Sequence, residues 1–166
     1  MTREEQDVFL SKEYAEAIRY MDNAKETLQK AIKKDDGYYT DKKYVRTACG
    51  TAYNGVLLAL DAWFEMKGVE NLKKNNRKSI EFYKRHVSEF DKKMADYFDT
   101  VYSVLHLNGY YDGTLKVKTI QTGFEDAYKI IEKIKPENPV EVKASKLGAA
   151  KRLLSSFFVS IAVMFR

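Results

Sequence analysis

The side chains best suited to chemistry lie in one stretch, VYSVLHLNGYYDG, residues 101–113. An imidazole can act as a general base near neutral pH, and amide, phenol and carboxyl groups can form hydrogen bonds with a substrate. The weak candidates for such catalysis are His106, Asn108, Tyr110 and Asp112. On a helix His106 and Tyr110 share a ridge with Tyr102, whereas the other two candidates fall on a second ridge. The spacing therefore places the four candidates on two different ridges, and they would not converge on one substrate.

Positive charge is scarce in this stretch. Its only local cation is His106, and an imidazole with an unperturbed pKa near ~6.5 is mostly neutral at pH 7. Gly109 or Gly113 can end the helix, and the carbonyl end of a helix repels anions. We therefore interpret Tyr102, His106 and Tyr110 as a helix end and an interface, and we expect no ribonuclease activity.

A second candidate site is the basic segment NLKKNNRKSIEFYKRH, residues 71–86. Asn75 or Asn76 is a good N-cap for a short helix whose N-terminus could hold a phosphate together with nearby cations. The candidate binding residues are Lys73, Lys74, Arg77, Lys78 and Arg85. The alternative is an ordinary basic, solvated loop, which we favour. His86, one turn beyond Phe82, is expected to pack at the edge of the core.

Length and composition limit the class of protein. A chain of 166 residues, 45% hydrophobic and 32% charged, is typical of one globular domain. Its 29 basic and 24 acidic residues permit an anionic partner without indicating nucleic acid. Because Cys49 is the lone cysteine and there are two histidines, we predict no internal disulfide, no metal site and no cofactor. An N-terminus without an apolar run and the lack of any stretch of ~20 apolar residues predict a cytoplasmic protein.

Apolar residues recur at three- and four-residue steps, which predicts an all-α fold, an up-and-down bundle of four to five helices. The first helix begins at a capping box of Thr2 and Glu5 or at Ser11, and its stripe extends to Ile32. It precedes the break DDGYYTD, residues 35–41. The second spans about 42–67, with Gly68 as the C-terminal cap.

Beyond the short third helix, a longer helix runs through residues 94–105 into the stretch 101–113. Another is capped by Thr119 or Thr122 and ends at Pro136. Six residues from the strongest stripes are expected to share one core: Val56, Leu60, Trp63, Val101, Leu105 and Ile131.

The C-terminal part of the chain has a different character. The segment LLSSFFVSIAVMF, residues 153–165, is uncharged, and its apolar stripe consists of Leu147, Ala150, Leu154, Phe157, Ile161 and Met164. We therefore divide the chain into a bundle, residues 1–136, and an additional C-terminal apolar helix, residues 137–166, that packs on the bundle or a partner. Its own bundle is the first expectation for what covers it, then a second copy of the chain, then a membrane surface. Phe157 and Ile161 belong to the predicted interface.

The order of these helices resembles the HEPN superfamily, helical bundles linked to nucleotide and RNA biology. In bacterial members, the second helix reads like an Ala-Tyr-Tyr-Ala run followed by aliphatics, an aromatic and a Lys-Gly turn. The residues that fit this outline are Ala52, Tyr53, Leu57, Leu60, Lys67 and Gly68. The sequence LHLNGYYDG, residues 105–113, resembles the ending of the family's later helix. The resemblance covers residues 14–135 and implies a HEPN-like bundle.

The catalytic motif of HEPN ribonucleases, an Arg followed after four to six residues by a His, is not present. His106 stands where the Arg would be expected, and Tyr111, Asp112 and Gly113 occupy the place of the His. A carboxylate with a pKa near ~4 is a poor base at neutral pH, so Asp112 does not replace that His. The sequence therefore favours a protein that is not an enzyme.

Three functions stay open at this point. The first is a non-catalytic HEPN-like bundle that acts as a protein-interaction or nucleotide- or RNA-binding module. The second is a metal-independent endoribonuclease with an atypical active site that takes Arg85 or Arg77 from elsewhere in the fold. The third is a protein held at a membrane surface by its last helix. The expected partner is a second copy of the chain, and the resemblance adds a separate nucleotidyltransferase or antitoxin chain.

Overall fold

The computed structural model describes residues 2–69, 78–137 and 139–140. Within these residues the protein is an all-α bundle, as predicted. The helices are α1 (Arg3–Gln29), α2 (Lys42–Met66), α3 (Ile80–Phe90), α4 (Lys92–Val101), the π-helix η1 (Tyr102–Asp112) and α5 (Val117–Lys133). The predicted C-terminal helix, with Phe157 and Ile161, lies outside the described residues.

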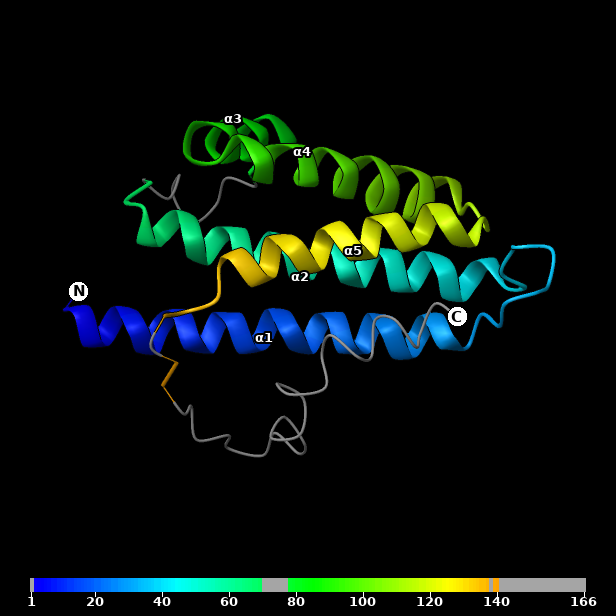
Figure 1. The fold of residues 1–166 in the computed structure, drawn as a ribbon, viewed down its shortest axis with the longest axis horizontal. Coiled ribbons are helices and arrows are strands. Elements are labelled where there is room, and N and C mark those ends of the chain that lie inside the picture. Colours follow the sequence, from blue (N-terminus) through cyan, green and yellow to red (C-terminus); the bar gives the residue numbers. More distant parts are fainter. Residues whose placement is uncertain (1, 70–77, 138, 141–166) are drawn as a thin grey trace.

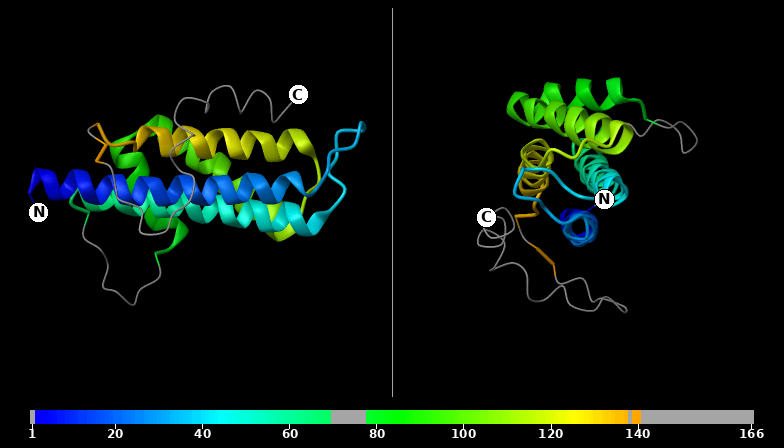
Figure 2. Two further views of the ribbon diagram at one scale, coloured as in Figure 1. Left: turned by 90° about the horizontal axis from the view of Figure 1, so that it is seen from below. Right: turned by 90° about the vertical axis from the view of Figure 1, so that its right-hand side faces the viewer.

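The long helices run alternately up and down (Figure 1). Helix α1 packs mainly on α2, α4 continues directly into η1, and α5 returns between α4 and α1. Seen end-on, α1, α2, α5 and the α4–η1 rod form the four corners of the bundle, and α3 lies outside this square on α4 (Figure 2). The arrangement is that of an up-and-down four-helix bundle with one added short helix.

Several helix ends follow local sequence signals. Thr2 and Glu5 form the predicted capping box at the start of α1, with the Glu5 carboxylate accepting from the Thr2 N–H at 2.7 Å. Asp41 caps α2 through the N–H of Lys43. Gly68, just after α2, has φ of 73°, a left-handed conformation in which glycine is unstrained.

Other helix ends differ from the prediction. Helix α3 begins at Ile80 with Ser79 as its N-cap; Asn75 and Asn76 lie outside the described residues. Thr119 or Thr122 was predicted to cap the helix that corresponds to α5, and this prediction is wrong. Helix α5 starts at Val117 after Lys116, and the Thr122 hydroxyl donates to the Lys118 carbonyl. That helix ends at Lys133, before Pro136.

The end of the first apolar stripe was also predicted wrongly. Ile32 lies beyond the end of α1, has φ of 43° and is 66% exposed. Tertiary contacts of the turn explain this, because the backbone carbonyl of Ile32 accepts from the Thr40 N–H instead of continuing the helix.

The core confirms five of the six predicted residues. Val56, Leu60, Val101 and Leu105 are 0% exposed and Ile131 is 1% exposed. Trp63 differs: it packs against this core from the edge, with its ring centroid 5.5 Å from that of the exposed Phe90. Membership of an apolar stripe therefore did not distinguish the center of the core from its rim.

We predict that Leu60→Ala lowers the free energy of unfolding by roughly 2 to 5 kcal/mol, because a fully buried side chain leaves a cavity when it is truncated. Denaturant unfolding measures the change. Val8→Ala, at a position that is 42% exposed, is the matched control and should change little. A loss below about half a kcal/mol for Leu60→Ala would place that residue outside the core.

Asp91 gives a pH-dependent prediction, because its carboxylate caps α4 and pairs with Lys133 of α5. The Lys133 ammonium and the Met94 N–H lower the pKa of Asp91 below its usual value. A lowered folded-state pKa adds stability above the unfolded pKa of about 4, and this stability is lost as the pH falls through the folded value. Asp91→Asn keeps a capping side chain but should flatten the fall in unfolding free energy between about pH 5 and 2. An unchanged slope would show that Asp91 does not contribute.

Candidate functional site

The candidate site is a cluster of rings where η1 crosses α2. We call Tyr53, Tyr102, His106, Tyr110 and Tyr111 the ring cluster. Tyr53 comes from α2 and the other four from η1. The His106 ring stacks on Tyr53 at 4.5 Å, on Tyr102 at 5.3 Å and on Tyr110 at 6.2 Å between centroids. The predicted ridge of Tyr102, His106 and Tyr110 therefore exists. Tyr53 of α2 extends it across the interface between the two helices.

Two glycines allow this close crossing. A Cβ atom added to Gly109 would lie 2.5 Å from the Cys49 sulfur, and one added to Gly50 would lie 3.0 Å from the Tyr110 ring. Cys49 is completely buried, and burial raises its thiol pKa to about 12, so it acts here as a packing residue. Gly50 and Gly109 therefore mark the close contact between α2 and η1.

The helix that carries the cluster is a π-helix over its whole length, not the α-helix expected from the sequence. Its wider turns end at Gly113, where φ is 66° and the N–H donates to the Asn108 carbonyl five residues earlier. The Thr114 N–H donates to the same carbonyl at 2.8 Å. Asn108 therefore serves the helix end through its backbone, and π-helical segments are frequent at functional sites.

The cations at this end correct the sequence analysis, which counted His106 alone. The guanidinium of Arg46, on α2, donates to the Tyr111 carbonyl, and the Lys42 side chain passes directly over Gly113. Positive side chains near the carbonyl end of a helix complement its dipole. Their partners lie sixty or more residues away in the chain, so the local pattern of the stretch 101–113 contained no signal for them.

Lys84 supplies a third cation that the sequence analysis missed. Its ammonium lies 5.2 Å from the centroid of the Tyr102 ring and 2.8 Å from the Asp99 carboxylate. It joins α3 to the same surface. Three cations from two other helices thus flank the ring cluster.

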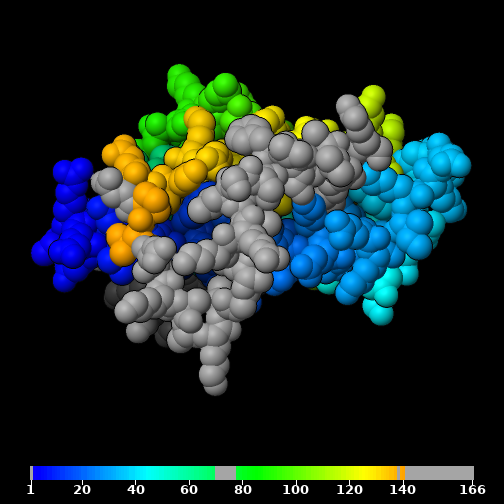
Figure 3. All heavy atoms as spheres, turned by 60° about the horizontal axis from the view of Figure 1, so that its bottom comes forward, coloured from blue at the N-terminus to red at the C-terminus, as the bar shows by residue number. Residues whose placement is uncertain are grey.

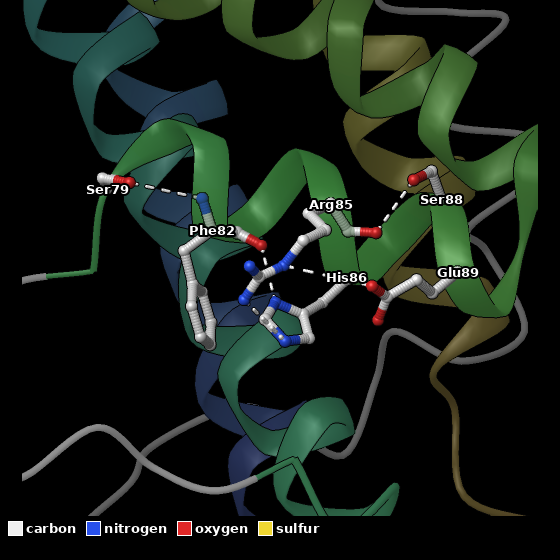
Figure 4. Close-up of polar contacts among 6 residues, drawn as sticks. All are labelled: Ser79, Phe82, Arg85, His86, Ser88 and Glu89. Atoms are coloured by element: carbon white, nitrogen blue, oxygen red, sulfur yellow. Dashed lines mark hydrogen bonds and ion pairs between the residues drawn. The ribbon is translucent and has the colours of Figure 1, made fainter.

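The other predicted catalytic residues do not converge on His106. Asp112 is exposed at the end of η1, and Arg85 contacts His86 and Glu89 on its own helix α3. Figure 4 shows the Arg85 guanidinium beside the His86 ring, 3.4 Å between nitrogens, with the Glu89 carboxylate on its other side at 4.0 Å. The structure therefore does not bring Arg85 to the ring cluster.

His86 packs as predicted at the edge of the core. Its ring centroid lies 4.2 Å from that of Phe82, and its Nδ1 lies 2.8 Å from the Phe82 carbonyl (Figure 4). The ring centroid of Phe64, on α2, lies 5.7 Å from that of His86, so the imidazole is occupied in packing between α3 and α2.

Of the predicted phosphate-binding residues, Lys73, Lys74 and Arg77 lie outside the described residues. Lys78 is largely buried, and its ammonium donates to the Asp61 carboxylate at 2.8 Å. The Tyr83 hydroxyl donates to the same carboxylate oxygen, at 2.9 Å. Burial, and then the charge of Asp61, raises the pKa of Tyr83. The charge of Lys78 is balanced by the Asp61 carboxylate, so this ion pair stabilises the contact between α2 and the start of α3 and attracts an added anion only weakly.

In the described parts of the chain, no group of three or more His, Cys, Asp or Glu side chains could hold a metal ion. Among the helices that the structure describes, none combines the length and apolar character needed to cross a membrane.

Comparisons with known proteins place the sequence in a group without an assigned activity. The domain of unknown function DUF5618 matches residues 12–136. A solved structure of a protein of unknown function from Dyadobacter fermentans has 40% sequence identity and a TM-score of 0.66. The match covers 74% of this chain and 94% of that chain. No curated protein matches the sequence.

The stacking of His106 leads to a stability prediction. His106→Ala removes three stacked ring contacts, each worth about 0.5–1.5 kcal/mol beyond its buried area, so it should lower the unfolding free energy by at least about 1 kcal/mol. His106→Phe keeps a ring at this position and should lose less. Equal losses for the two variants, measured by denaturant unfolding, would show that the stack does not stabilise the fold.

Proposed function

We propose that this chain, which belongs to the DUF5618 family, is a non-catalytic HEPN-like helical bundle that acts as an interaction module and binds a second copy of itself through η1. The observation that carries the proposal is the outer surface of this helix. Leu107, Tyr110 and Tyr111 are 39%, 47% and 61% exposed, although all three are large and apolar. We call them the η1 face. Aromatic side chains are enriched at protein interfaces, where they bury much area at low entropic cost.

The inner side of η1 makes this face rigid. Tyr110 is stacked over His106 and backed by Gly50, and the Tyr111 ring stands edge-on to His106 with centroids 5.1 Å apart. The Tyr111 carbonyl is held by Arg46 of α2. Rings already held in one arrangement lose little freedom on binding, so more of the burial energy is left for association.

The HEPN-like assignment is supported by the contact between the two segments that carry the resemblance. Tyr53, in the segment Ala52–Gly68, stacks on His106, in the segment LHLNGYYDG. The two patterns therefore belong to one surface of the bundle. Fold similarity does not transfer activity, and the arrangement around His106 argues against catalysis. Its ring is stacked on three others, and Arg46 serves the Tyr111 carbonyl.

A second candidate function is the binding of a nucleotide or single-stranded RNA on the same face. Exposed rings close to Lys84 and Arg46 favour it. Bases stack on aromatic side chains, and basic side chains bind the phosphates of the backbone. Self-association ranks first because the carbonyl end of η1, which disfavours anions, lies next to the exposed rings.

We predict that the chain sediments as a dimer and that Tyr110→Asp with Tyr111→Asp converts it to a monomer, because two buried carboxylates without partners are costly at an interface. Tyr38→Asp is the matched control: Tyr38 is 47% exposed, the same as Tyr110, but lies in the α1–α2 connection. This control should leave the mass unchanged. A wild-type chain that sediments as a monomer across micromolar concentrations would refute self-association.

We also predict that the purified protein, with or without added metal, cleaves RNA no faster than His106→Ala. The reason is that the His106 ring is stacked on three other rings and the nearby Arg46 guanidinium donates to the Tyr111 carbonyl. RNA cleavage that His106→Ala abolishes, with helix content and mass unchanged, would instead establish a nuclease.

A further inference from the structure

On the side of the bundle away from η1, helices α1 and α5 lie next to each other but make few contacts, whereas α1 packs along α2. The residues along this boundary, which we call the α1–α5 seam, are Ser11, Tyr14, Ile18 and Asp22 of α1 and Tyr128 and Glu132 of α5. The Tyr14 hydroxyl donates to the Glu132 carboxylate at 3.4 Å, and burial together with Asp22 raises the pKa of Tyr128.

The seam has a mixed apolar and acidic character. Tyr14, Ile18 and Tyr128 are half-buried and pack against the core, while Asp22 and Glu132 bring carboxylates to its edges. An apolar strip with acidic borders fits an amphipathic helix that carries basic residues.

The described chain ends on this seam. After α5 the backbone turns toward α1, and the Val140 N–H donates to the Ser11 hydroxyl at 3.0 Å. Ser11 is 5% exposed and Val140 is 39% exposed, so this hydrogen bond joins a buried residue of α1 to an exposed residue beyond α5. Figures 1 and 3 show residues 134–137 and 139–140, in orange, lying against the N-terminal half of α1.

The rest of the sequence is basic and apolar, and is therefore complementary to the acidic and apolar seam. Beyond Val140 the chain has one acidic residue, Glu141, against five basic ones: Lys143, Lys146, Lys151, Arg152 and Arg166. The uncharged segment 153–165 has the apolar stripe Leu154, Phe157, Ile161 and Met164. As one helix rising about 1.5 Å per residue, residues 147–165 would be about 28 Å long, roughly two thirds of the length of the 27-residue α1.

We propose that residues 147–165 dock as a helix in the α1–α5 seam of the same chain, with the stripe on Tyr14 and Ile18 and the basic residues near Asp22 and Glu132. The Ser11–Val140 hydrogen bond starts this segment at the correct end of α1. The proposal is independent of the η1 face and assigns the tail to its own bundle.

Crosslinking in the full-length protein tests this docking. Ile18→Cys is combined in turn with Leu154→Cys, Phe157→Cys and Ile161→Cys, and each pair is treated with a short bismaleimide. The native Cys49 is buried with a raised thiol pKa and should react slowly. The matched control replaces Ile18→Cys by Ser103→Cys, at an exposed position on η1 across the bundle.

The expected result is an intramolecular crosslink for at least one Ile18 pair, several-fold faster than for the same tail position paired with Ser103. Equal rates at the two positions, or no intramolecular crosslink with Ile18, would overturn the proposal. Crosslinks only between copies would assign the tail to a second chain instead. Loss of the Ile18 crosslink on adding phosphatidylserine vesicles, with the protein floating with them, would assign it to a lipid surface. If Ile18→Cys lowers the helix content, Tyr14→Cys on the same seam replaces it.

Discussion

The close crossing of η1 over α2 is the constraint on which the candidate site depends. Gly109 lies so near the Cys49 sulfur that no larger side chain fits without movement. This contact brings Tyr53 within stacking distance of His106 and sets Tyr110 over Gly50. Because interiors pack at nearly crystalline density, a shift at this crossing would move every ring of the cluster.

The crossing also explains why the polar groups of the stretch 101–113 do not form a catalytic site. Near the end of the π-helix the Tyr111 carbonyl accepts from the Arg46 guanidinium of α2, and the Lys42 side chain lies over Gly113. A phosphate would have to compete with the Tyr111 carbonyl for Arg46. The imidazole of His106 is meanwhile part of the packing between two helices. Charge and geometry together favour a surface for recognition over a site for proton transfer.

Two surfaces of the bundle differ in how closely their helices pack. On one side the η1 face presents rigid rings outward, although its helix is well packed within the bundle. On the other side α1 and α5 are joined mainly at their edges, through Tyr14, Glu132 and the hydrogen bond between Ser11 and Val140. The first surface is the one proposed for self-association, and the second is the one proposed to hold the chain's own C-terminal segment.

Periodicity and capping residues were enough to predict the all-α class, the span of α2, five of six core residues and, as one of two alternatives, the capping box at Thr2. These features depend on contacts within a few residues, which a local pattern contains. The start of α5 after Lys116 was missed because the threonine caps nearby are not the ones that the packed bundle uses. Helix α3 begins after Ser79, a cap that the sequence pattern did not single out. The ridge of Tyr102, His106 and Tyr110 was also predictable, because residues four apart are neighbours on a helix. Arg46, Tyr53 and Lys84 could not be assigned to that ridge from the sequence, since they come from α2 and α3, and only the packing of those helices against η1 brings them to it.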